Sequence, residues 1–171
     1  MPGRSSQPLQ PLVWLGAPML LSIGATVLLA APLRVFGFGL PEPVFPMVLA
    51  FAWAVIRPSV LGPFALLLLG LFSDLFWGAP IGLWPLSLLI CYFGALISRN
   101  LMAGQSSGVL WGWYAALTAA AFACAYAVTV IVSGNKPGLG ATALQLIVTA
   151  ALYPIANYLI ERFEDADVRF R

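Results

Sequence analysis

Residues Leu66–Leu86 read LLLLGLFSDLFWGAPIGLWPL, and they set the architecture of the whole chain. Two apolar runs are joined here by the short segment Gly78-Ala79-Pro80-Ile81-Gly82. Proline presets one backbone angle, and glycine adopts conformations that other residues resist, so this segment predicts a tight turn between two helices. A single carboxylate, Asp74, stands inside the first run. The pattern is typical of a helical hairpin in a membrane.

The composition of the whole chain agrees with this interpretation. Of 171 residues, 61% are apolar and 8% are charged, whereas soluble domains have about 45–50% apolar and about 25% charged residues. We therefore predict a single integral membrane domain over residues 1–171, surrounded by a lipid bilayer. The net charge of +2 is too small for a nucleic-acid-binding surface, so no nucleic acid is expected as a partner.

Six apolar runs, separated by polar residues and by proline and glycine, predict an all-α polytopic protein with six transmembrane helices. The predicted helices cover residues 12–33, 41–56, 61–77, 82–98, 109–132 and 139–160, and a cytoplasmic tail follows over 161–171. The first, fifth and sixth are long enough for the roughly 17–25 residues of a crossing, and the others need tilt or local bilayer thinning. Three prolines crowd the start of the second, which predicts an extended entry to that helix.

The first run has an alternative interpretation as a signal peptide. Its apolar stretch is longer than the roughly 7–15 residues usual for such a peptide, so we predict a helix of the mature protein. Basic residues then orient the chain, because they gather on the cytoplasmic side of membrane proteins. With six crossings, one face has six basic residues and the other has two, which predicts that both termini are cytoplasmic. The larger set is Arg4, Arg57, Arg99, Arg162, Arg169 and Arg171, and the smaller is Arg34 and Lys136.

The residue types argue against catalysis. Histidine is absent, which removes the usual general base and metal ligand, and both cysteines, Cys91 and Cys124, lie in apolar runs. Few polar side chains lie deep in the runs, Gln145 and Thr149 among them, and these are too few for a path for ions or sugars. We predict that the protein is not an enzyme, with no catalytic residue, no metal ligand and no cofactor.

Asp74 is the one carboxylate embedded in a predicted helix. Placing a charge in the middle of a membrane costs about 2.5–3.5 kcal/mol, and the C-terminal end of a helix disfavours a negative charge. Something should therefore compensate it: Arg34 or Lys136, the backbone amides of the Gly78–Gly82 turn, or headgroup water. A substrate or proton site at Asp74 remains an alternative.

Several motifs together resemble the family of the bacterial rod-shape-determining membrane protein MreD. They are Arg57-Pro58, a glycine in the third helix, an acidic residue followed by leucine, the turn with glycines at both ends, and an aromatic-proline pair in the last helix. The resemblance marks these residues as candidates for partner contact or for fixing the fold: Gly70, Asp74, Leu75, Gly78, Pro80, Gly82, Arg57, Pro58, Tyr153 and Pro154.

The resemblance implies a component of the bacterial cytoplasmic (inner) membrane that belongs to the cell-wall elongation complex and is required for rod shape. It implies binding to the single-pass scaffold MreC, and thereby a link between MreB filaments and peptidoglycan synthases. It also implies a fold similar to the substrate-binding subunits of energy-coupling-factor transporters. A substrate-binding subunit of a vitamin transporter is therefore the alternative function, and a small membrane enzyme using Asp74 is a third. Homo-oligomerisation stays open.

Overall fold

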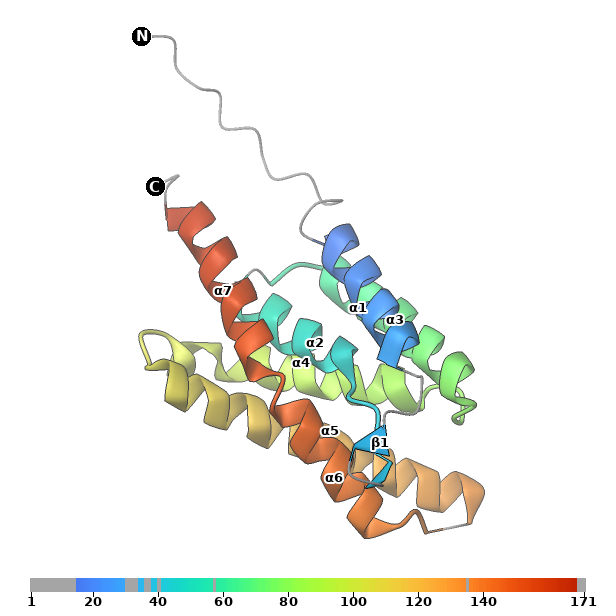
Figure 1. Cartoon of the computed structure of the whole chain (residues 1–171). Coiled ribbons are helices and arrows are strands. Elements are labelled where there is room, and N and C mark those ends of the chain that lie inside the picture. Colours follow the sequence, from blue (N-terminus) through green and yellow to red (C-terminus); the bar gives the residue numbers. More distant parts are fainter. Residues whose placement is uncertain are drawn as a thin grey trace, which may run out of the picture.

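The computed structural model describes residues 15–29, 34–35, 38–39, 41–56, 58–134 and 136–168. Within these residues the fold is all-α, as predicted, apart from one two-residue strand pair in which Arg34 lies opposite Gly39 (Figure 1). The elements in chain order are α1 (Ala17–Leu29), β1 (Arg34–Val35), β2 (Phe38–Gly39), α2 (Phe45–Ile56), α3 (Leu61–Trp77), α4 (Leu83–Met102), α5 (Ser107–Ser133), α6 (Leu139–Ala150) and α7 (Tyr153–Val168).

Helix α2 is the centre of the bundle. Every residue from Pro46 to Ala54 is buried, as expected for a helix that is apolar all round. It packs against α1, α3, α4 and α7 (Figure 1). The prediction of a helix over 41–56 was wrong at its start, since residues 41–44 are not helical and α2 begins at Phe45. The expected extended entry, caused by crowded prolines, is confirmed.

Three helices in the described part of the chain are long enough and apolar enough to cross a membrane. They are α4, α5 and the combined segment Leu139–Glu161. Helices α1, α2 and α3 are apolar but shorter, with 13, 12 and 17 residues. The helix predicted over 12–33 is seen as α1, and residues 12–14 and 30–33 lie outside the described residues. Six crossings therefore stay a prediction.

The last predicted helix is broken into α6 and α7, which was not expected. Pro154 has no backbone N–H to donate to the Ala150 carbonyl, so a regular helix cannot continue there. Side chains of α5 bond the carbonyls at the break: Trp111 Nε1 donates to Ala150 O at 3.2 Å and the Tyr114 hydroxyl to Thr149 O at 3.0 Å. Such partners are needed where water is scarce.

The predicted end of the last helix at residue 160 is also corrected. Helix α7 continues to Val168, because glutamate and arginine are good helix formers and nothing in the sequence stops the helix at Glu161. The side chains of 162–168 lie outside the described residues, as do residues 169–171.

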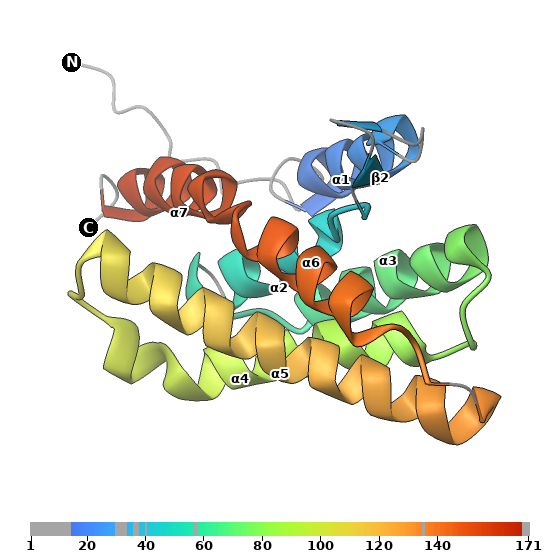
Figure 2. The same cartoon turned by 60° about the horizontal axis from the view of Figure 1, so that its bottom comes forward.

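The bundle has two distinct ends, visible in Figure 2. At one end the last turns of α2 and α4 meet, where Arg99 Nε donates to Val55 O at 3.1 Å. At the other end lie the α3–α4 turn and the C-terminal end of α5, which line one cavity. We call the first the arginine end and the second the hairpin end. Helix α4 therefore runs antiparallel to both α3 and α5.

Candidate functional site

Asp74 connects α3 to the start of α4. Its side chain is buried, at 1% exposure. Oδ2 accepts a hydrogen bond from the Gly82 amide at 2.6 Å, and Oδ1 accepts one from the Trp84 amide at 2.9 Å. These amides lie at the N-terminal end of α4, where no carbonyl within the helix is in reach and a negative charge is favoured. The carboxylate of one helix thus caps the next.

This arrangement answers the question of what compensates Asp74. The expectation that amides of the Gly78–Gly82 turn would do so is confirmed by the bond from Gly82, and the Trp84 amide in α4 adds a second bond that was not predicted. Asp74 forms no ion pair with Lys136, and the side chain of Arg34 lies outside the described residues. Each carboxylate oxygen accepts a hydrogen bond from a backbone amide, so the geometry gives Asp74 a structural task.

The turn after Asp74 requires its two glycines. Gly78 ends α3 with φ +63°, and its amide donates to the Asp74 carbonyl. Gly82 precedes α4 with φ +97°, again a conformation that side chains resist. Between them the Pro80 carbonyl accepts the Leu83 amide at 3.1 Å. Backbone hydrogen bonds therefore fix the turn both where it leaves α3 and where it enters α4.

Gly70 allows α3 and α4 to meet at their backbones. A Cβ placed on Gly70 would lie 2.5 Å from the Pro85 Cα, far closer than side chains tolerate. The contact lies one helical turn before Asp74 and so brings its carboxylate within reach of α4. Leu75, by contrast, is 70% exposed and takes no part in this contact. Gly70, Asp74 and the turn form one unit, which we call the capped hairpin.

The remaining candidates lie elsewhere. Pro58 is exposed between α2 and α3, and Arg57 lies outside the described residues. Tyr153 is buried at the α6–α7 break, where its hydroxyl lies 3.2 Å from Ser107 Oγ and 3.1 Å from Asn157 Oδ1. The predicted residues therefore do not form a single site.

A second polar cluster was missed by the sequence analysis. It ties the extended segment before α2 to α3 and α6. Trp77 Nε1 donates to Glu42 Oε2 at 2.6 Å, Gln145 Nε2 donates to Glu42 O at 3.0 Å, and the Val44 amide donates to Thr149 Oγ1 at 3.1 Å. Gln145 and Thr149 are four residues apart, hence on one face of α6. That spacing of two polar residues in an apolar helix was the one feature of the sequence that could have indicated this cluster.

Replacing Thr149 with valine tests this second cluster. The change keeps the shape but removes the acceptor of the buried Val44 amide, which should lower the free energy of unfolding by about 1–3 kcal/mol. Thermal unfolding of the detergent-purified protein measures it. The control is Thr142→Val, since Thr142 is only partly buried and its hydroxyl donates to the Gly138 carbonyl at the start of its own helix. Equal midpoints for the two variants would contradict the assigned role.

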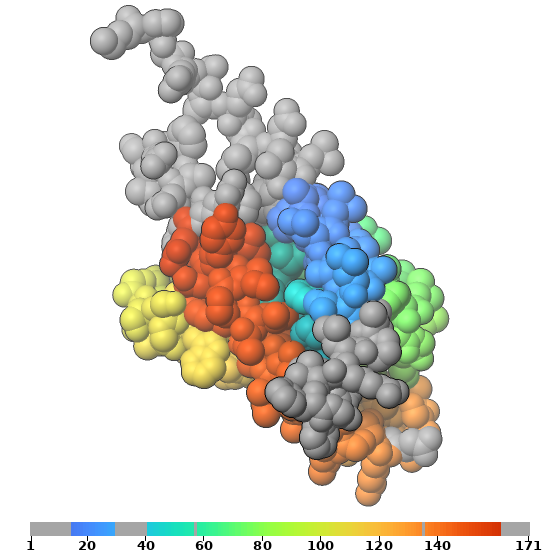
Figure 3. Space-filling view, in the orientation of Figure 1, coloured from blue at the N-terminus to red at the C-terminus, as the bar shows by residue number. Residues whose placement is uncertain are grey.

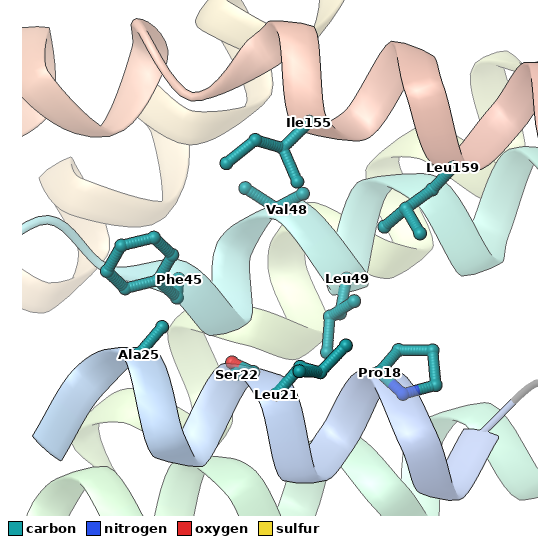
Figure 4. A pocket seen from close by; sticks show the side chains of 9 residues that line it. All are labelled: Pro18, Leu21, Ser22, Ala25, Phe45, Val48, Leu49, Ile155 and Leu159. Atoms are coloured by element: carbon teal, nitrogen blue, oxygen red, sulfur yellow. The ribbon is translucent and has the colours of Figure 1, made fainter. Parts of the chain in front are cut away.

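An apolar groove lies between α1, α2 and α7. Its volume is about 270 Å³. Figure 3 shows part of α2 between the surfaces of α1 and α7, and Figure 4 shows side chains from the three helices around the groove. The hydroxyl of Ser22 is buried there without a hydrogen-bond partner among the described residues. The lining is otherwise apolar: Pro18, Leu21, Ala25, Phe45, Val48, Leu49, Ile155 and Leu159.

These features define an α-helical membrane protein with a capped hairpin, a lateral apolar groove and a polar cluster at one end. In the part of the chain that the structure describes, no group of three histidine, cysteine or acidic side chains could bind a metal ion. No family model, curated protein or solved structure matches the chain. The resemblance to MreD and the similarity to energy-coupling-factor subunits therefore stay predictions.

Proposed function

We propose that this protein is a non-catalytic MreD-type component of the bacterial inner membrane, part of the wall elongation complex required for rod shape. It binds an MreC-type single-pass scaffold and so helps couple MreB filaments to peptidoglycan synthases. The observation that carries the proposal is the capped hairpin. Four of the residues that carry the resemblance, Gly70, Asp74, Gly78 and Gly82, each have a defined structural task in one unit. A chance match of short apolar motifs gives no reason why these residues should act together in one structural unit.

The proposal includes six crossings with both termini in the cytoplasm. Helices α4 and α5 and the segment Leu139–Glu161 have spanning length. The shorter α1, α2 and α3 complete the set, with α2 shielded from lipid by its neighbours. The arginine end then faces the cytoplasm and the hairpin end faces outward, in keeping with the predicted bias of basic residues.

The groove between α1, α2 and α7 is the proposed binding site for the partner's single transmembrane helix. Helices associate in lipid through close packing and interhelical hydrogen bonds, because lipid itself is apolar. The groove offers a recess for large apolar side chains, and the Ser22 hydroxyl offers a donor that lacks a partner. Helix α1 also exposes apolar side chains beside it: Leu20 and Leu28 are 71% and 79% exposed.

Filling the groove tests the proposal. Ala25→Trp places a large ring in the recess, and the resulting clash should reduce co-purification of the MreC-type scaffold by about tenfold, since overpacking costs about 1–3 kcal/mol. The matched control is Leu68→Trp, because Leu68 on α3 is 60% exposed. Co-purification is measured by quantitative mass spectrometry after mild-detergent extraction. If Ala25→Trp co-purifies as much scaffold as the wild-type protein does, the groove is not part of the interface. If the wild-type protein co-purifies no scaffold, the proposed function is refuted.

A further inference from the structure

A separate cavity opens at the hairpin end, away from the groove. Its volume is about 570 Å³, within the range of about 300–1,000 Å³ usual for small-molecule sites. Residues before α2, the α3–α4 turn, the end of α5 and helix α6 line it. None of its lining residues lines the groove, so the two features are independent.

The lining carries a negative charge. Glu42 is the only charged side chain among the described lining residues. Of the residues that the structure describes, only Trp77 donates a hydrogen bond to its carboxylate, and that bond uses Oε2. Oε1 receives none from them. The carboxylate can therefore accept a further donor from a ligand in the cavity.

Helix ends add to this negative potential. Trp77 and Gly78 at the C-terminal end of α3 line the cavity, as do Thr129 and Ser133 in the last two turns of α5. Helix C-termini carry partial negative charge. The N-terminal end of α4 also reaches the cavity, but its positive end is offset, since Asp74 accepts two of its first amides. The cap on α4 therefore leaves the cavity with a net preference for cations.

Two indole rings favour an organic cation over a metal ion. Trp77 and Trp84 both line the cavity, with ring centroids 5.2 Å apart. Tryptophan is the aromatic residue that attracts ammonium groups most strongly. A divalent metal ion is usually bound by more than one charged ligand, and Glu42 is the single carboxylate among the described lining residues. We propose that this cavity binds the ammonium group of a small organic cation at Oε1 of the Glu42 carboxylate, beside the two indole rings.

The test uses the whole protein in an uncharged maltoside detergent, with choline and ethanolamine as probes. Binding is followed by thermal unfolding and by the tryptophan fluorescence of the chain. Both probes are expected to raise the unfolding midpoint, whereas 3,3-dimethyl-1-butanol, the neutral isostere of choline, is not. Glu42→Gln keeps an oxygen for Trp77 but removes the charge, and it should weaken binding about tenfold. Glu161→Gln, a carboxylate bonded to Asn157 on α7, is the matched control and should bind as the wild type does.

A second experiment distinguishes a free solute from a lipid headgroup as the ligand, since both can present the same ammonium group. Wild type and Glu42→Gln are placed in phosphatidylglycerol nanodiscs with and without phosphatidylethanolamine. Stabilisation by the soluble probes identifies a solute site, and stabilisation by phosphatidylethanolamine alone identifies a headgroup site. Absence of both effects, or equal effects of choline and its neutral isostere on the wild-type protein, overturns the proposal even if Glu42→Gln fails to fold. The result does not depend on scaffold binding.

Discussion

Replacing Asp74 with alanine is expected to lower the free energy of unfolding by about 2–4 kcal/mol. The change removes two charge-assisted hydrogen bonds, and it leaves the buried Trp84 amide and the part-buried Gly82 amide without their acceptor. For a chain of this length the unfolding midpoint should fall by about 5–12 °C. Thermal unfolding in detergent, followed by tryptophan fluorescence, measures the shift. Scaffold co-purification should fall with it, because the hairpin then loses its fixed geometry.

Two variants make the result specific. Asp74→Asn retains one acceptor oxygen and should fall between alanine and wild type. Ser73→Ala is the neighbouring control, since the buried Ser73 hydroxyl bonds only to the Leu69 carbonyl of its own helix. It should cost little. If Asp74→Ala unfolds at the wild-type midpoint, the cap does not stabilise the hairpin. If Asp74→Ala is destabilised but still binds the scaffold, the capped hairpin is needed for stability and not for partner contact.

Gly70→Ala should be the second most damaging change, at about 2–3 kcal/mol. The added Cβ would overlap the backbone of Pro85, which has no flexible end to move aside. The two helices must separate, and overpacking of this kind costs about 1–3 kcal/mol or more. The separation also stretches the bonds from Asp74 to α4, which adds to the loss. Size-exclusion yield and the thermal midpoint report the effect.

Gly24→Ala is the matched control for Gly70→Ala. Gly24 lies inside α1, and a Cβ there meets nothing within 4 Å. Alanine is the better helix former, so this variant should be unchanged or more stable by up to about 1 kcal/mol. Stabilisation of both variants would mean that helix propensity, and not the approach of α3 to α4, decides the outcome at Gly70.

Local signals in the sequence predicted the hairpin well. The turn, the C-terminal end of α3 and the need to compensate the charge of Asp74 all follow from residues close together in the chain, between Gly70 and Trp84. Such contacts need no knowledge of the tertiary fold. The extended entry to α2 was predictable for the same reason, since prolines restrict their own neighbourhood.

Long-range contacts were not predictable in this way. Glu42 meets Trp77 and Gln145 across separations of 35 and 103 residues. Pro154 was visible in the sequence, but the break was not predicted, because a proline in a membrane helix is tolerated in several ways. Its outcome depends on Trp111 and Tyr114, which lie on another helix and supply the missing donors. The cavity at the hairpin end needs four separate segments, so no single stretch of sequence indicates it.

The central claim is that this chain is a scaffold-binding, non-catalytic component of the elongation complex. The most direct measurement is mass spectrometry of the proteins that co-purify with the tagged protein from its own membranes in mild detergent. The account predicts recovery of a single-pass MreC-type scaffold together with peptidoglycan synthases. Recovery of paired ATPases with a coupling subunit, and no such scaffold, would contradict it and identify the chain as a transporter subunit.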